Sequence, residues 1–348
     1  MSGPRLHYRH SGNSVSRMRT RILLVAVTVA LLATACGDPD ATTLTVYSGR
    51  SQALVQPLFD RFIAETGIRL EVRYAESVDL AATLAEEGGN SPADVFFAAD
   101  PASLGAVAAA GLLQPLPERI LALVPDRFSD RDGFWVGTSG RSRSVVYDTS
   151  VVDPADLPSS LDGFTDPRWR GRLAIAPTNA SFVASVAAMI LLDGEDATRA
   201  WLQGIAANQP LAYPKNSVIV AAVNDGEAQA GLVNHYYLLQ LQAEQGETIA
   251  ANHFLSGGAG ALIMPAGAGI LATTDDEAAA ERFVEFLLAD SAQRFFADTV
   301  FEFPMVAGID PNRVLPALSD LSPPDLDLSD LAEVLDLATD LIAEAGLL

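Results

Sequence analysis

Two adjacent tyrosines, Tyr236 and Tyr237, combine a residue type and a spacing that suit metal binding. They follow the apolar run 230–233, which is predicted to be a buried strand, so both phenols can face one cleft. Phenolate is a hard anionic donor that suits a hard cation such as Fe³⁺. A bound cation lets a phenol with an ordinary pKa of about 10 ionise at neutral pH. The simpler alternative is a pair of half-buried tyrosines with hydrated hydroxyl groups at an interface.

The sequence contains none of the residue patterns that common hydrolytic or nucleotide-dependent enzymes need. It has four histidines, of which two lie in the first ten residues, so only His235 and His253 remain. No G-x-S-x-G, P-loop or H-E-x-x-H motif is present, and a single cysteine excludes a cysteine-rich zinc site. We therefore expect a binding protein rather than an enzyme.

Composition narrows the class of partner. The 348 residues suffice for two domains of ordinary size, and 49% of them are apolar. The formal net charge is −22, and nucleic-acid phosphates require Lys and Arg. We therefore expect a protein that does not bind nucleic acid, and we also predict a monomer.

The first 35 residues have the layout of a secretory signal peptide. Five arginines and no acidic residue precede the apolar run 22–33, which is shorter than the roughly 20 residues that span a bilayer. Cys36, the only cysteine, follows in a context that resembles the lipobox of bacterial lipoproteins. We predict a signal peptide over 1–35, lipidation of Cys36, a tether over 36–43, and thus a membrane-anchored extracytoplasmic protein. The alternatives are an uncleaved membrane anchor and an incidental cysteine, and Met18 is an alternative start.

Strand and helix patterns alternate along both halves of the remaining chain, which predicts an α/β fold. In the first half we expect strands at 44–47, 68–74 and 93–98 and helices at 51–66, 79–87 and 101–110. Later strands are expected at 173–176 and 230–233, and later helices at 181–192, 197–207, 217–225 and 276–288. Extended stretches at 135–148 and 260–264 join the halves, and an amphipathic helix is expected from Asp325 onward. This pattern predicts two lobes with a hinge and a ligand in the cleft between them.

Several motifs, in the same order, resemble those of the periplasmic ferric-ion-binding proteins, the substrate receptors of bacterial iron ABC importers. The motifs are LTVYSG at 44–49, SPADVF at 91–96, SGRSR at 139–143, YDT at 147–149, KNSV at 215–218 and NHYY at 234–237. The resemblance extends over residues 44–304. It implies a two-lobed periplasmic-binding-protein fold, in which two mixed or parallel sheets flanked by helices are joined by hinge strands.

We assign residues 44–140 and 266–305 to the N-terminal lobe and residues 141–265 and 306–348 to the C-terminal lobe. In the family that the chain resembles, tandem tyrosines supply iron ligands, and their positions match the tyrosine pair described above. The implied function is to bind ferric iron outside the cytoplasm, in the periplasm or on the outer face of the cytoplasmic membrane. The implied partner is an ABC permease of that membrane.

The chain departs from the family at other ligand positions. Ser51 and Ala99 stand where one branch has a histidine and a glutamate, and Phe182 stands where another branch has a further tyrosine. Asp100 adjoins the glutamate position, and whether Asp100 or Ser51 contributes a ligand stays open. Two phenolates do not fill the coordination shell of Fe³⁺, so we expect exogenous ligands such as carbonate or bicarbonate, phosphate, or water.

An anion site is predicted from arginines and helix starts. Free N–H groups and the dipole at a helix N-terminus favour anions, and a guanidinium group suits a bidentate oxyanion. Similar proteins hold carbonate with an arginine at the position of Arg141, and their site is lined by an asparagine at that of Asn216. The candidate anion-binding or cleft residues are Arg50, Ser51, Arg141, Asn179, Ala180, Ser181 and Asn216. The alternatives are salt bridges for the arginines and helix capping for Asn179 and Ser181.

Three other functions stay open. Related receptors bind thiamine, polyamines, phosphonates or sugars, and the replacements at Ser51 and Ala99 allow such a ligand. The second is a hydrolytic enzyme that uses the cleft, and the third is a surface-exposed interaction or sensor lipoprotein. A calorimetric ligand screen separates the receptors from one another.

Overall fold

The computed structural model describes residues 42–348 together with residues 1 and 3. Cys36, Met18 and the predicted signal peptide and tether up to residue 41 lie outside the described residues. Residues 43–348 form one compact unit of strands and helices. Within the described part of the chain, no helix is both long and apolar enough to cross a membrane.

Within residues 42–348, eleven strands are joined by hydrogen bonds, and the main path runs β2-β1-β3-β10-β5-β8-β6-β7. The first part of this path consists of β1 Thr43–Ser48, β2 Arg69–Tyr74, β3 Val95–Ala98 and β10 Ile263–Leu271. The second part consists of β5 Trp135–Asp148, β8 Ala230–Asn234, β6 Leu173–Ile175 and β7 Leu211–Ala212. Three short strands pair beside the path: β4 Leu113–Gln114, β9 Ala250–His253 and β11 Phe303–Pro304. Strand β1 is parallel to β2 and β3, and β6 is parallel to β7 and β8.

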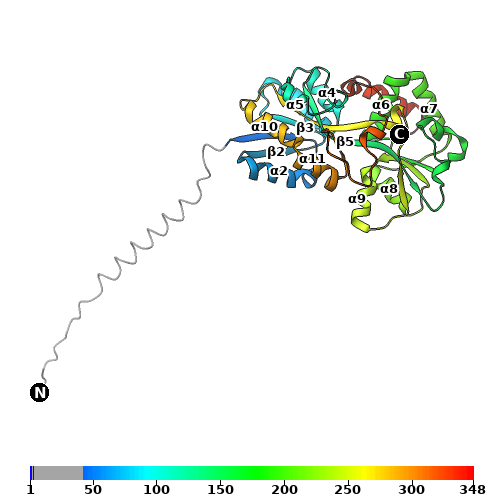
Figure 1. The fold of residues 1–348 in the computed structure, drawn as a ribbon, viewed down its shortest axis with the longest axis horizontal. Coiled ribbons are helices and arrows are strands. Elements are labelled where there is room, and N and C mark those ends of the chain that lie inside the picture. The colour runs from blue at the N-terminus through cyan, green and yellow to red at the C-terminus, as the bar shows by residue number, and fades with distance from the viewer. Residues whose placement is uncertain (2, 4–41) are drawn as a thin grey trace. The chain divides into compact units, whose positions relative to one another are not determined.

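Strand β5 belongs to both halves of the sheet. Its first part, through Ser142, pairs with β10, and its second part, from Arg143, pairs with β8 and β9. Strand β11 also pairs with β5, at residues 139–140. Figure 1 shows β5 passing between two groups of helices. The two lobes are therefore joined along β5, and β10 and β11 run beside it at the junction.

Helices flank the sheet on both sides of this junction (Figure 1). The first group consists of α2 Gln52–Thr66, α3 Ser77–Glu87, α4 Pro101–Ala109, α5 Glu118–Leu121, α10 Glu277–Leu288 and α11 Asp290–Phe295. The second consists of α6 Ala180–Asp193, α7 Glu195–Ala207, α8 Asn216–Asn224, α9 Tyr236–Gln245 and α12 Leu335–Glu344. Aromatic packing holds α2 on α10, because the ring centroids of Phe59 and Phe62 lie 5.5 and 5.1 Å from that of Phe283.

Most of the predicted elements are confirmed, and their ends shift by a few residues. Helix α2 ends where predicted because Gly67 adopts a φ of 75° and its N–H bonds to the carbonyl of Ile63. The predicted helix from residue 325 onward is wrong in its first part: residues 328–334 form a 3-10 helix, and α12 begins only at Leu335. Two prolines at 323–324 and the Asp327 carboxylate, which accepts the Ser329 N–H at 3.0 Å, explain the later start. The predicted extended stretch 260–264 begins instead as a 3-10 turn, and the strand starts at residue 263.

Candidate metal centre

Tyr236 and Tyr237 open helix α9 directly after strand β8. Strand β8 ends at Asn234, and His235 already has helical backbone angles (φ −56°, ψ −37°), so the chain passes from strand to helix without a loop. The two phenol rings lie 4.2 Å apart between centroids, with an interplanar angle of 31°. Both side chains are partly buried. Two phenol groups therefore meet at the end of a fully buried strand.

The surroundings of Tyr236 oppose its ionisation. Burial raises the pKa of the Tyr236 phenol well above its ordinary value, and the neighbouring Tyr237 raises it further. The Arg141 guanidinium acts in the opposite direction. The Tyr236 phenol is therefore protonated at neutral pH when no cation is bound. A highly charged metal ion reverses this balance, because it stabilises the phenolate directly.

Arg143 lies beside the tyrosine pair and was not among the predicted site residues. It is 5% exposed on β5, and its Nη1 donates to the side-chain oxygen of Asn234 at 2.9 Å and to Ser181 Oγ at 3.1 Å. Burial lowers the pKa of Arg143 to about 10, and the two tyrosines act to raise it, so the guanidinium stays charged at neutral pH. The spacing between Arg141 and Arg143 could have identified Arg143 from the sequence. Residues two apart on a strand point to the same face, and Arg141 was already a candidate.

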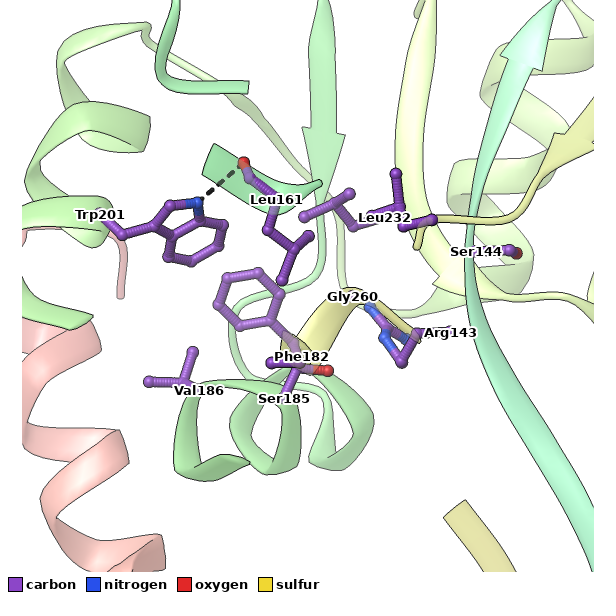
Figure 2. Close-up of a pocket in the computed structure, with 11 residues that line it drawn as sticks. Arg143, Ser144, Leu161, Phe182, Ser185, Val186, Trp201, Leu232 and Gly260 are labelled. Carbon is purple, nitrogen blue, oxygen red and sulfur yellow. Dashed lines mark hydrogen bonds between the residues drawn. The ribbon is translucent and has the colours of Figure 1, made fainter. Parts of the chain in front are cut away.

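Arg143 also lines a small internal cavity in the C-terminal lobe (Figure 2). The cavity has a volume of about 10 Å³, close to the space that one water molecule needs. Apolar side chains such as Leu161, Phe182 and Trp201 form most of its wall, and Trp201 Nε1 donates to the Leu161 carbonyl at 3.0 Å. This cavity is too small for an organic ligand.

Four predicted anion-site residues lie together at the starts of α6 and α8. Asn179 caps α6, because its Oδ1 accepts the Ser181 N–H at 3.1 Å and the Ser181 hydroxyl at 2.6 Å. Asn216 Nδ2 donates to Ser181 Oγ at 2.9 Å, and Ala180 is exposed in the first helical turn. Ser181 thus connects this group to the Arg143 guanidinium. The capping considered as the alternative for Asn179 is present.

Arg50 makes a buried ion pair, which is the alternative considered for it. Its Nη2 lies 2.7 Å from Glu302 Oε1, and both side chains are almost fully buried. Ser139 Oγ donates to Glu302 Oε2 at 2.6 Å. Burial opposes ionisation of Glu302, but the Arg50 and Arg141 charges and these hydrogen bonds outweigh it, so the pKa of Glu302 lies below its usual value. Glu302 was missed because its partners come from distant parts of the chain.

Two guanidinium N–H groups in this region lack acceptors. Within the described residues, Arg50 Nε and Arg141 Nε are buried and make no hydrogen bond, whereas Arg141 Nη2 donates to the Ala99 carbonyl. A buried donor without a partner costs roughly 1–3 kcal/mol, so an acceptor beside these groups is favoured. Ser51 stands exposed at the N-terminus of α2, and its side chain makes no capping hydrogen bond.

Two residues at or beside the other ligand positions of the family make contacts of their own. Asp100 caps α4, because its two carboxylate oxygens accept the N–H and the hydroxyl of Ser103 at 2.8 and 3.0 Å. Phe182 is buried with its ring centroid 6.3 Å from that of Trp201. In the part of the chain that the structure describes, no three or more His, Cys, Asp or Glu side chains are arranged to hold a metal ion.

Comparison with known protein sequences gives a consistent result. A family model described as bacterial extracellular solute-binding protein matches residues 90–327. The major ferric iron-binding protein of Neisseria meningitidis serogroup A is 33% identical over 338 residues, which cover 95% of this chain and 100% of the relative. Iron uptake protein A1 of Synechocystis is 31% identical, over 95% of this chain and 99% of the relative.

Solved structures agree with the sequence comparison. Iron-bound HitA from Pseudomonas aeruginosa matches with a TM-score of 0.81 and 34% identity over 88% of this chain and 99% of that one. Apo FutA2 from Synechocystis matches with a TM-score of 0.77 and 30% identity over 89% and 100%. A Trichodesmium protein in complex with iron and citrate matches with a TM-score of 0.78 and 25% identity over 88% and 100%. The two-lobed α/β periplasmic-binding-protein fold expected from the sequence is confirmed.

Proposed function

The chain belongs to the periplasmic ferric iron-binding proteins, a family of bacterial extracellular solute-binding proteins that are not enzymes, and we propose that it is the ferric-iron receptor of an ABC importer. Its substrate is Fe³⁺, which the phenolates of Tyr236 and Tyr237 bind at the start of α9. The observation that carries the proposal is the pairing of these two phenols, 4.2 Å apart between ring centroids, next to buried guanidinium groups.

The phenols suit this ion better than a softer or less charged one. The raised pKa of Tyr236 means that a bound cation must displace a proton from the phenol, and a small, triply charged ion does so most strongly. A divalent ion competes less well for the same oxygen. The site therefore favours Fe³⁺ over Fe²⁺.

A synergistic anion completes the coordination shell, because two phenolates leave part of it unfilled. The Arg141 charge lowers the pKa of Tyr236, and the two tyrosines act to raise the pKa of Arg143, so both guanidinium groups interact with the tyrosine pair. The unpaired Nε groups of Arg50 and Arg141 supply further donors. Carbonate or bicarbonate and phosphate are the anions we propose. The citrate bound with iron in the Trichodesmium relative supports an oxyanion as partner ligand.

The N-termini of helices α6, α8 and α2 extend the proposed anion site. Asn179, Ala180 and Ser181 open α6, where the helix dipole favours negative charge, and Asn216 joins them through its bond to Ser181. Ser51 occupies the corresponding position at the start of α2. Anion contacts from α2 and from α6 engage different lobes, so binding favours a closed form through hinge motion. We propose that the two lobes that move relative to each other are residues 44–140 with 266–305 and residues 141–265 with 306–348.

The closed receptor delivers its iron to an ABC permease of the cytoplasmic membrane. Lipidation of Cys36 after removal of residues 1–35 anchors the monomer to the membrane surface, outside the cytoplasm. Labelling of cells with a radioactive fatty acid tests this anchor: we expect label in the wild-type protein and none after Cys36→Ala. Equal labelling of both contradicts the anchor and leaves the iron site unaffected.

Equilibrium dialysis tests the receptor. We expect about one iron per chain with Fe³⁺ and bicarbonate or phosphate, and much less when these anions are removed. A calorimetric screen with thiamine, a polyamine, a phosphonate and a sugar is expected to show no tight binding. Tight binding of one of these compounds, with no retention of iron, overturns the proposal in favour of a receptor for that compound.

A further inference from the structure

His235 precedes the tyrosine pair and has no role in the coordination described above. Its side chain is fully buried, Nδ1 accepts the Ser142 N–H at 3.1 Å, and Nε2 lies 2.7 Å from the Phe301 carbonyl oxygen. A backbone N–H can only donate, so Nδ1 is the acceptor and Nε2 carries the proton that is donated to Phe301. Both ring nitrogens are therefore used by backbone groups, and neither is free to bind a metal ion.

The Phe301 carbonyl belongs to an unusual stretch of backbone. Phe301 has a φ of 62°, a left-handed conformation that is rare for a large residue without a reason in its surroundings. The following residue, Glu302, makes the buried ion pair with Arg50, and its N–H bonds to the Phe296 carbonyl at 2.9 Å. The segment 301–303 is thus held on one side by His235 and on the other by Arg50.

The imidazole ring lies between the metal-site helix and this segment. Its centroid is 6.0 Å from that of Tyr236, with the rings nearly perpendicular at 85°, and 4.9 Å from that of Phe303. Asn252 Nδ2 donates to the His235 carbonyl at 2.8 Å and fixes the backbone there. The imidazole ring therefore lies close to both Tyr236 and the segment 301–303.

We propose that His235 is a positioning residue that couples the tyrosine pair to the segment 301–303, which lies beside β5 at the junction. The inference rests on the proposed function, because the role it assigns is to set the phenols for the ferric ion. When the lobes close, the segment 301–303 shifts with the ion pair to Arg50, and the Nε2 hydrogen bond transmits this shift to the start of α9. The coupling is reciprocal, so a metal ion held by the phenols biases the position of the same segment.

Two substitutions separate the contacts of the imidazole. His235→Gln keeps a donor at the distance of Nε2 and retains the bond to Phe301, whereas His235→Asn reaches only as far as Nδ1 and loses it. For purified protein loaded with Fe³⁺ and bicarbonate, we expect His235→Asn to bind iron about tenfold more weakly. This change corresponds to the contribution of one hydrogen bond. We also expect its phenolate-to-iron absorption band to shift. His235→Gln is expected to retain most of the affinity and the wild-type band.

His253 is the matched control, because its Nε2 also bonds to a backbone carbonyl, but to that of Pro158, at 3.0 Å, rather than to the segment 301–303. We expect His253→Asn to keep both the band and the affinity. A His235→Asn protein that melts at a lower temperature but keeps the wild-type band and affinity overturns the inference, because its role is then merely structural. A wild-type protein without any band instead contradicts the proposed function.

One measurement needs no variant and applies even if His235→Asn does not fold. Gallium(III) is a diamagnetic ion of the same charge as Fe³⁺ and permits nuclear magnetic resonance of the loaded protein. We expect the His235 Nε2 ¹⁵N resonance of the wild-type protein to shift on gallium loading, while that of His253 stays in place. A His235 resonance that does not respond in a protein shown to bind gallium overturns the coupling.

Discussion

The Oε1 atom of Glu302 lies 2.7 Å from Nη2 of Arg50, and 252 positions separate these residues in the chain. Arg50 follows the first strand of the N-terminal lobe, and Glu302 lies in the last segment that passes along the junction of the two lobes. Both side chains are almost completely buried, and Ser139 of β5 donates to the second carboxylate oxygen. One buried ion pair therefore connects three segments of the junction.

Glu302→Gln is expected to destabilise the metal-free protein by about 3–5 kcal/mol, because it leaves the Arg50 charge buried without a counter-ion. Urea unfolding measures the change. Glu285→Gln is the control, since the Glu285 carboxylate makes an exposed ion pair with Arg119 and such pairs contribute only about 0–1 kcal/mol. Equal unfolding midpoints for the two variants contradict the importance of the buried pair.

The stability of the metal-free protein is expected to fall in mild acid because of His235. Burial lowers the pKa of His235 from 6.5 to about 4, so the unfolded chain takes up this proton at a higher pH than the folded protein. The contribution of His235 is complete above pH 6.5 and is lost as the pH falls from 6.5 towards 4, by up to about 3 kcal/mol. Unfolding midpoints over this range measure it. His235→Gln is expected to flatten the dependence, and an unchanged slope in this variant refutes the assignment.

Arg143→Gln is expected to weaken iron binding roughly tenfold to a hundredfold and to reduce its dependence on bicarbonate. The reason is the loss of a buried charge-assisted donor beside the phenols and the anion. Competition with a soluble iron chelator at several bicarbonate concentrations measures both effects. Arg172→Gln is the matched control, because Arg172 lies in the same lobe and bonds to Gln229 instead. An Arg143→Gln protein with unchanged affinity and unchanged bicarbonate dependence contradicts the anion role.

Gly137→Ala is expected to lower the melting temperature by a few degrees, equivalent to about 1–3 kcal/mol. A Cβ at Gly137 on β5 would lie 2.6 Å from the carbonyl oxygen of Phe128, and a backbone atom has little room to move away. Gly89→Ala serves as the control, since a Cβ there meets no atom within 4 Å. Identical melting temperatures for the two variants would show that β5 tolerates a wider spacing than the structure indicates.

The sequence predicted most helices and strands, because the apolar spacing and the end signals that define each of them lie within or next to that element. Residues 51–66 repeat apolar positions at helical spacing and end at Gly67, and the observed helix covers 52–66. The C-terminal segment misled the prediction, since its Leu and Ala content favours a helix while Asp327 caps a 3-10 turn instead. Such competition between a capping carboxylate and helix propensity is decided by tertiary packing.

Some contacts of the candidate site also follow from the local sequence, and others depend on the fold. Tyr236 and Tyr237 are adjacent in the chain, so the sequence alone brings them together. Arg143 meets Asn234 only because β5 pairs with β8 in a register that sets these two residues opposite each other. Glu302 meets Arg50 across 252 positions. Contacts of this kind depend on strand register and on the path of the last junction segment, and no local pattern encodes either.

The visible absorption spectrum of the protein loaded with Fe³⁺ and bicarbonate tests the central claim most directly. Phenolate coordination predicts a charge-transfer band that is absent before iron is added, weakened or shifted in Tyr236→Phe and Tyr237→Phe, and lost when both changes are combined. Tyr74→Phe is the control, because the Tyr74 hydroxyl lies in the N-terminal lobe and bonds to Gln56. The account predicts an unchanged band for this variant. A wild-type protein that stays colourless while retaining iron, or a band that survives the double substitution, contradicts coordination by the tyrosine pair.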